Sequence, residues 1–236
     1  MKKVQWIVGV VFSMSLLLVL LITSFQLAAY GDFTFYQKEY EKYDVTSALD
    51  MKMEDVMYVT REMMDYLIDD RENLEVYTVV EGRKQDFFNE QDKLHMMDVK
   101  QLFLGGLLLR KVAAAVMVVC LCILFATKAE WKKILARGYQ ISLGITAVAV
   151  VFAAGALIVD FNAAFTVFHE VFFTNDLWIF DPAEDYMIRM LPEGFFYDMV
   201  LRIGGIFIVG MSVVLLISLF LSRQGRKNRK IKRTYE

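Results

Sequence analysis

The sequence predicts an all-α membrane protein with four transmembrane helices, a small and mostly helical extracytoplasmic cap, a reentrant-like outer loop, and cytoplasmic N- and C-termini. Hydrophobic residues make up 57% of the chain and gather in four long apolar runs, between which basic and acidic segments alternate. A helix needs about 20 apolar residues to cross roughly 30 Å of hydrocarbon. We therefore expect one integral membrane domain whose spans are about 4–29, 102–126, 141–159 and 199–221.

The first run follows Met1, Lys2 and Lys3, as the apolar core of a signal peptide would. Its core is longer than the ~7 to 15 residues of a signal peptide, and the cleavage-like sequence at 27–29 is weak. We therefore expect an uncleaved membrane anchor. No Cys comes directly after it, so the chain is not expected to be a lipoprotein itself.

Charge predicts the orientation. Lys and Arg fall in three segments that four crossings place on one side: the N-terminus, 127–140 and 222–236. Basic residues favour the cytoplasmic side of a membrane. The acidic segments 30–101 and 160–198 are then extracytoplasmic. The basic tail is short and adjoins a span, so we interpret it as an orientation signal that touches anionic lipid rather than a nucleic-acid site.

In the first outer segment, Ser47 with Asp50 predicts the start of an amphipathic helix whose apolar positions recur over 53–68. Its methionine stripe fits either plain packing or contact with lipid chains. Residues 74–80 favour a strand, and the Glu-Gly-Arg sequence at 81–83 predicts a turn, so a short hairpin is expected here.

A helix that continues into the second span is predicted to begin at Asn89, with Asp92 completing the cap. On this helix Gln91, His95 and Asp98 share one face, so Asp98 is placed to accept a hydrogen bond from the ring of His95. A base with an orienting carboxylate is half of a catalytic arrangement. The alternative is a surface histidine that makes an ordinary helix pair.

In the second outer segment, aromatic residues at helical spacing over 161–172 predict that the third helix continues beyond its apolar run, carries His169 and ends at Asn175. Asp, Pro and Glu at 181, 182 and 184 predict the start of a short helix. Residues 191–194 should end it before the fourth span. Both prolines of the chain lie here, which favours a loop with a defined shape.

Charges also occur within or beside the spans, at Arg110, Lys111 and Arg202. They are expected either to reach the outer headgroups or to guide a glyceryl or carbonyl oxygen of lipid. Cys120 and Cys122 lie too deep in the second span for a disulfide of the outer segments, and we interpret them as small packing or lipid-facing residues.

The outer segments exclude some chemistry. They contain Ser47 but no Cys, and no G-x-S-x-G motif, so a serine lipase is not supported. His95, His169, Asp98 and Glu170 lack a metal-binding spacing such as H-E-x-x-H, so no metal is expected. The chemistry that remains for these residues is base catalysis with a nucleophile supplied by the substrate. Two imidazoles can deprotonate an incoming amine or alcohol and protonate the departing one.

Three segments resemble signatures of a known family: DKLHMMDVK at 92–100, FHEVFFTNDLWIFDP at 168–182 and MIRMLPEGFFYD at 187–198. They are similar to those of the lipoprotein intramolecular transacylase (Lit) family of bacterial four-span membrane proteins. The resemblance extends over essentially the whole chain. It implies transfer of the sn-2 acyl chain of a lipoprotein's diacylglyceryl-Cys to the α-amino group of that Cys, which gives the lyso form.

The resemblance implies catalytic roles for His95 and His169, no cofactor, and a diacylated lipoprotein N-terminus and membrane lipid as partners. We expect a monomer that binds no nucleic acid, in the bacterial cytoplasmic membrane, with its active site at the extracytoplasmic face. Two alternatives remain: a lipid-ester hydrolase in which the histidines activate water, and a non-catalytic chaperone or sensor that docks through its acidic cap. Candidate supporting or substrate-binding residues are Asp98, Asn175, Trp178, Asp181, Glu193, Asp198 and Arg110.

Overall fold

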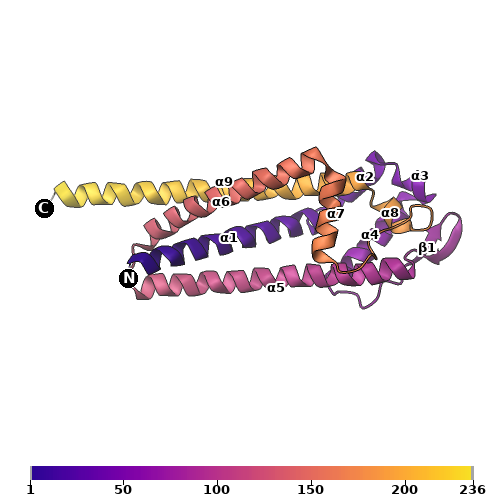
Figure 1. Cartoon of the computed structure of the whole chain (residues 1–236), viewed down its shortest axis with the longest axis horizontal. Helices are drawn as coiled ribbons and strands as arrows, with labels where there is room; N and C mark the ends of the chain where they lie inside the picture. The colour runs from indigo at the N-terminus through magenta and orange to yellow at the C-terminus, as the bar shows by residue number, and fades with distance from the viewer. Residues whose placement is uncertain (1, 235–236) are drawn as a thin grey trace. The chain divides into compact units, whose positions relative to one another are not determined.

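A computed structural model describes the backbone of residues 2–234 and the side chains of residues 3–222. Most described residues are helical (Figure 1). The basic side chains of the C-terminal tail, which are predicted to set the orientation of the chain in the membrane, lie outside the described residues. The elements in chain order are α1 (Lys2–Tyr30), α2 (Thr34–Lys42), α3 (Val45–Leu49), α4 (Met53–Leu67), β1 (Tyr77–Val80), β2 (Arg83–Asp86), α5 (Glu90–Ala126), α6 (Trp131–Val159), α7 (Phe161–Phe172), α8 (Tyr186–Met190) and α9 (Glu193–Thr234).

Within the described residues, four helices are long and apolar enough to cross a membrane: Lys3–Tyr30, Glu90–Ala126, Trp131–Val159 and Glu193–Ser222. This confirms the four predicted membrane helices and makes the chain an integral membrane protein. Each helix extends beyond its apolar run, because polar turns at the ends continue the same backbone hydrogen bonding. The side of the membrane on which each end lies stays a prediction.

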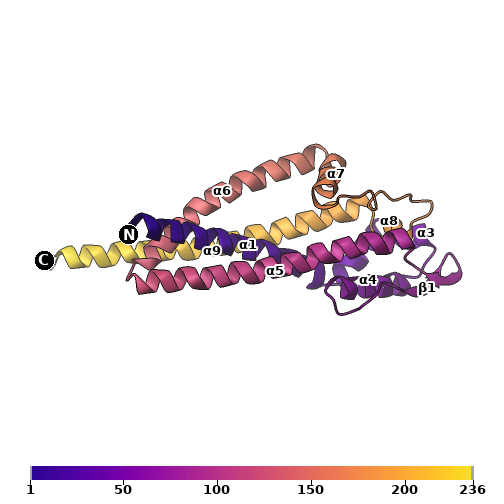
Figure 2. The same ribbon diagram turned by 60° about the horizontal axis from the view of Figure 1, so that its bottom comes forward.

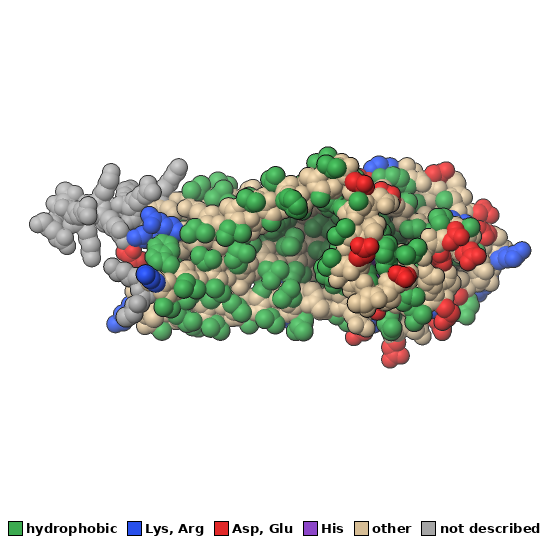
Figure 3. Space-filling view, in the orientation of Figure 1, with side chains coloured by type: hydrophobic (Ala, Val, Ile, Leu, Met, Phe, Trp, Pro, Cys, Tyr) green, Lys and Arg blue, Asp and Glu red, His purple; other side chains and the backbone are tan. Residues whose placement is uncertain are grey.

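The chain divides into two compact units. Unit 1 contains the chain up to Phe25, residues Leu108–Ile158, and the chain from Ile203 onward. Unit 2 contains Gln26–Leu107 and Val159–Arg202. On the face drawn in Figure 3, hydrophobic side chains cover the helices of unit 1, whereas Asp and Glu are concentrated on unit 2.

Unit 1 packs around a core of Leu17, Tyr139, Phe207 and Met211, and the Tyr139 hydroxyl donates a 2.6 Å hydrogen bond to the Met211 carbonyl. The buried residues of α6 all lie at or before Ser142. Figure 2 shows the later part of α6 standing apart from α9. The exposed apolar side chains of this part, such as Phe152, are suited to lipid contact.

Unit 2 has a core of aromatic and aliphatic side chains. The Tyr40 hydroxyl and the Thr60 hydroxyl are 2.7 Å apart and join α2 to α4. The ring of Phe195, at the start of α9, packs on Tyr36 and Tyr40 with centroid distances of 5.5 and 6.2 Å. The methionine stripe of α4 packs against this core, with Met63 and Met64 each 3% exposed, which favours the packing interpretation.

The start of α4 was predicted wrongly. Ser47 lies in the separate helix α3, where its hydroxyl donates to the Asp44 carboxylate at 2.6 Å. Asp50 adopts the left-handed conformation that ends α3, with φ of 46°. Extended Lys52 then precedes α4 without a side-chain cap. Ser47 therefore does not cap the amphipathic helix.

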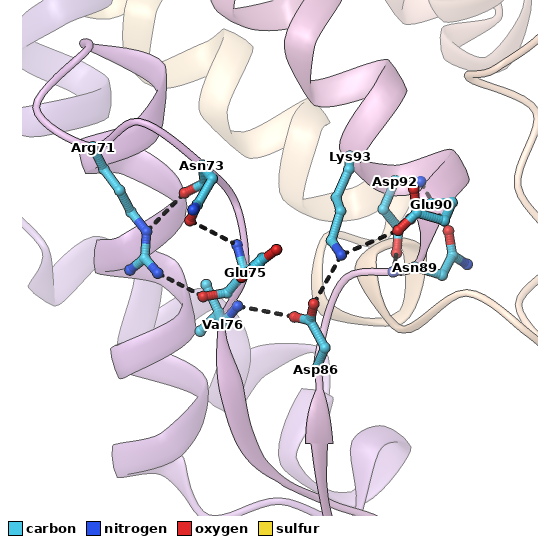
Figure 4. Close-up of polar contacts among 9 residues, drawn as sticks. All are labelled: Arg71, Asn73, Glu75, Val76, Asp86, Asn89, Glu90, Asp92 and Lys93. Atoms are coloured by element: carbon cyan, nitrogen blue, oxygen red, sulfur yellow. Dashed lines mark hydrogen bonds and ion pairs between the residues drawn. The ribbon is translucent and has the colours of Figure 1, made fainter.

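The predicted hairpin is confirmed: β1 pairs antiparallel with β2, and Glu81 and Gly82 form the turn with φ of 52° and 71°. Two successive residues with positive φ are typical of a type I′ turn. Figure 4 shows how the hairpin joins α5: Asp86 accepts a hydrogen bond from the Val76 amide at 2.9 Å and pairs with Lys93 at 2.9 Å.

The predicted start of α5 is also confirmed. The Asn89 amide donates to the Asp92 carboxylate at 3.0 Å, and the Asp92 amide donates to the Asn89 side-chain oxygen at 2.9 Å. These reciprocal bonds satisfy amides that the first turn leaves unpaired. From this start α5 runs unbroken to Ala126.

The third helix is not continuous, contrary to the prediction. It ends at Val159, and Asp160 is extended, with its carboxylate accepting the Ala163 amide at 2.9 Å. Asp160 therefore starts a new helix, α7, by capping it. This helix ends at Phe172, before Asn175.

The predicted helix start at Asp181 is wrong as well. The Asp181 carboxylate accepts the Ala183 amide at 2.9 Å, and the Asp181 carbonyl accepts the amides of Glu184 and Asp185. These bonds close a single turn, and α8 begins only after Asp185. The predicted break before the fourth span is confirmed, because α8 ends at Met190 and α9 begins at Glu193.

Candidate active site

The two histidines of the chain lie beside each other within unit 2. Their ring centroids are 6.0 Å apart and their planes differ by 29°. Asn89 and Asp92 cap the start of α5 within two turns before His95, and Asp160 starts the helix that carries His169 near its end. Both side chains are buried, with 5% and 7% of their surface exposed.

The hydrogen bonding of His169 determines its tautomer. Its Nδ1 is 2.8 Å from the Phe165 carbonyl oxygen, one turn earlier on α7. A carbonyl oxygen only accepts, so Nδ1 carries a proton, and in the neutral ring Nε2 is the unprotonated nitrogen. His169 therefore offers a basic nitrogen on the side of the ring opposite its anchor.

Burial lowers the pKa of His169 below its ordinary value, because the charged ring loses solvation. The Phe165 carbonyl acts in the opposite direction, since it accepts a hydrogen bond from the protonated ring. The net effect lowers the pKa and favours the neutral ring. A proton on either ring also disfavours a proton on the other at this separation.

Aromatic rings surround the pair. Trp178 stacks on His169 at 4.9 Å between centroids, and Phe165 lies 4.1 Å from the same ring. Phe180 meets His95 edge-on at 5.4 Å. Phe173 contacts both imidazoles, at 5.1 Å from His95 and 5.5 Å from His169. This environment limits the access of water to the two bases.

Asp98 does not orient His95 as predicted. Its carboxylate accepts a 2.9 Å hydrogen bond from the Asn175 side chain. The buried Nδ1 of His95 has no hydrogen-bond partner among the described residues. Asp98 therefore holds the segment after α7 and leaves the His95 ring without a carboxylate partner.

A cavity of about 300 Å³ lies on the other side of Phe173, and neither histidine is among its lining residues. Phe173 belongs both to its wall and to the aromatic surroundings of the histidines. The remaining wall combines polar and apolar side chains, as small-molecule sites do. The cavity is lined by Asp98, Gln101, Leu102, Phe172, Phe173, Thr174 and Asn175.

Three other predicted site residues make their described hydrogen bonds to groups other than the two histidines. Asp198 binds Lys42 and the Tyr43 hydroxyl. Glu193 accepts a 3.4 Å hydrogen bond from Asn162, and Asp181 closes its own turn. Arg110 belongs to unit 1.

A family model supports the same interpretation: the model described as lipoprotein intramolecular transacylase Lit matches residues 10–196. The chain belongs to this family. It also resembles a solved structure of the membrane integral transacylase Lit from Bacillus cereus, with a TM-score of 0.80 and 21% identity over 96% of this chain and 100% of the other. No curated protein sequence matches the chain.

Two further Bacillus cereus Lit structures match, each of a mutant with one histidine replaced. The alanine mutant gives a TM-score of 0.77 at 20% identity and covers 96% of this chain and 97% of the other. The arginine mutant gives 0.75 at 20% identity and covers 96% of each. At 20–21% identity, these matches show that this member of the Lit family has the same fold as the Bacillus cereus structures.

Sequence reasoning did not assign a role to several neighbours of the pair. Phe165 and Phe173 stand four positions before and after His169, and Gln91 stands four before His95, so helical spacing was a usable signal for all three. Phe180 carried no such signal. It reaches His95 through the irregular segment after α7, whose course local sequence does not specify.

Proposed function

We propose that this protein moves the sn-2 acyl chain of a diacylated lipoprotein to the α-amino group of its N-terminal Cys, by acid–base catalysis without a protein nucleophile. The observation that carries the proposal is the buried imidazole pair, with the neutral His169 ring and its unprotonated Nε2. Membership in the transacylase family supports the reaction class.

In the proposed reaction the substrate amine attacks the carbonyl carbon of the sn-2 ester, and His169 Nε2 takes the amine proton. The carbon–oxygen bond then breaks, and the imidazole pair returns a proton to the glyceryl oxygen. An amide and a free hydroxyl are formed, and both rings end neutral. General acid–base groups of this kind contribute typically about 10²- to 10⁴-fold to a rate.

We infer that the cavity beside Phe173 receives part of the substrate next to the reacting ester. Its polar wall, with Asp98 and Asn175, suits the ammonium and glyceryl end of the substrate. The aromatic rings around the histidines exclude water, which would otherwise hydrolyse the ester. This favours transfer to the amine over release of a fatty acid.

The function is tested by mass spectrometry of lipoprotein N-termini from a bacterial host that lacks this activity, before and after expression of the chain. We expect the same lipoproteins to change from the diacylglyceryl form to the N-acyl, lyso-glyceryl form, which has equal mass but different fragments. Free fatty acid with loss of acyl mass would instead indicate a hydrolase. Unchanged lipoproteins would contradict both activities.

The orientation is a separate proposal that rests on the charge pattern. A reporter fused after Glu236 should report the cytoplasm, and a single Cys at Glu81 or Glu184 should react with an impermeant maleimide in intact cells. The background lacks Cys120 and Cys122. A Cys at Lys132 is the matched control and should react only after permeabilisation. The reverse pattern would contradict an extracytoplasmic active site.

A further inference from the structure

We propose that Gln91 is a positioning residue that holds the segment 177–179 against the imidazole pair. Its side-chain nitrogen donates to the Leu177 carbonyl at 3.1 Å and to the Ile179 carbonyl at 2.9 Å. A primary amide has two N–H donors, and this contact uses both. The two carbonyls belong to the residues on either side of Trp178.

The segment that Gln91 holds carries two of the rings around the bases. Trp178 stacks on His169 at 30° between planes, and Phe180 lies edge-on to His95. Gln91 is one helical turn before His95, so the amide and the imidazole share a face of α5. The contact therefore fixes the positions of both aromatic rings relative to α5, the helix that carries His95.

Asp98 of α5 and Asn89, which directly precedes α5, hold the two ends of the same segment. Asp98 accepts from Asn175 at the near end. At the far end Asn89 donates to the Asp185 carboxylate at 2.5 Å, and Asp185 also accepts the Asp181 amide at 2.7 Å. Loss of the Gln91 contact should therefore free the middle of the segment while its ends stay anchored.

The expected consequence is entry of water to His169. Burial lowers the pKa of this ring, so a looser segment lets the pKa rise toward its ordinary value. Catalysis needs the neutral base and is lost as the pH falls through this pKa. Release of the segment should thus move the acid limb of the pH–rate profile to higher pH. His95, which Phe180 meets edge-on, is exposed in the same way, and because burial also lowers its pKa, that pKa moves in the same direction. Asp98 keeps its hydrogen bond to Asn175.

The test is Gln91→Met, which keeps side-chain length and helix propensity but removes both donors. The matched control is Gln37→Met, at an exposed amide of α2 that donates to Glu41. With a synthetic diacylated lipopeptide, we expect kcat of Gln91→Met to fall by about 10- to 10²-fold, the scale of a small misplacement, with the acid limb shifted. Gln37→Met should match the unaltered chain. A rate that falls equally at every pH would contradict positioning.

This inference rests on the proposed function for its kinetics, so a second measurement does not use the reaction. In a Trp6→Phe, Trp131→Phe background, acrylamide quenching reports Trp178 alone, measured on the monodisperse fraction. We expect stronger quenching for Gln91→Met than for Gln37→Met. If quenching increases but the unaltered protein makes no lyso product, the proposed function fails and the positioning role stands. If the unaltered protein is active and Gln91→Met changes neither quenching nor the profile, the positioning role fails.

Discussion

Replacing His169 with Gln is expected to lower lyso-lipoprotein formation by about 10²- to 10⁴-fold, the range for loss of an acid–base group. Gln is planar and polar but cannot hold the amine proton. His95→Gln should be similarly impaired, and the double variant should be little worse than either single one if the two rings act in one transition state. Product is measured by mass spectrometry on purified, monodisperse enzyme.

The control for this prediction is Ser47→Ala. Ser47 is the only serine in the two outer segments, and this substitution removes its hydroxyl. Its hydroxyl binds Asp44 at an exposed position, so neither activity nor accumulation should change. Near-normal lyso product from His169→Gln would contradict the mechanism. So would an acyl group trapped on a protein hydroxyl, because the nucleophile is proposed to be the substrate amine.

Gly138→Val is expected to destabilise unit 1 by about 1–3 kcal/mol, the usual cost of overpacking. A Cβ at Gly138 would overlap the Gly9 carbonyl, so α1 and α6 would have to separate. The neighbouring atoms are backbone and cannot rotate away. Small residues permit such close helix approach in membranes. The measurement is the thermal unfolding midpoint in detergent.

Gly144→Val is the matched control, because it makes the same substitution on the same helix. A Cβ at Gly144 meets nothing within 4 Å among the described residues. Its unfolding midpoint should stay close to that of the unaltered chain. Equal losses at Gly138 and Gly144 would show that valine in α6, rather than the contact with Gly9, lowers stability.

The parts of the fold that sequence predicted well depend on neighbouring residues. Apolar length identifies the four membrane helices, the Asn89–Asp92 pair identifies the start of α5, and Glu81–Gly82 identifies the hairpin turn. Each signal acts within a few residues or by composition alone. Two predicted helix starts were wrong. The Ser47 hydroxyl binds Asp44 instead of capping α4, and the Asp181 carboxylate closes a single turn.

The candidate site divides in the same way. Local pattern singled out His95 and His169 and put each at the end of an apolar helix, where polar and aromatic residues become frequent in the sequence. Their 6.0 Å separation arises from packing of α5 with α7. The pairing of Asp98 with Asn175 and the hydrogen bonds of Gln91 to the Trp178 segment arise from packing of α5 with the chain after α7. Such contacts join residues far apart in sequence. Their geometry depends on how whole elements pack, which no short sequence window contains.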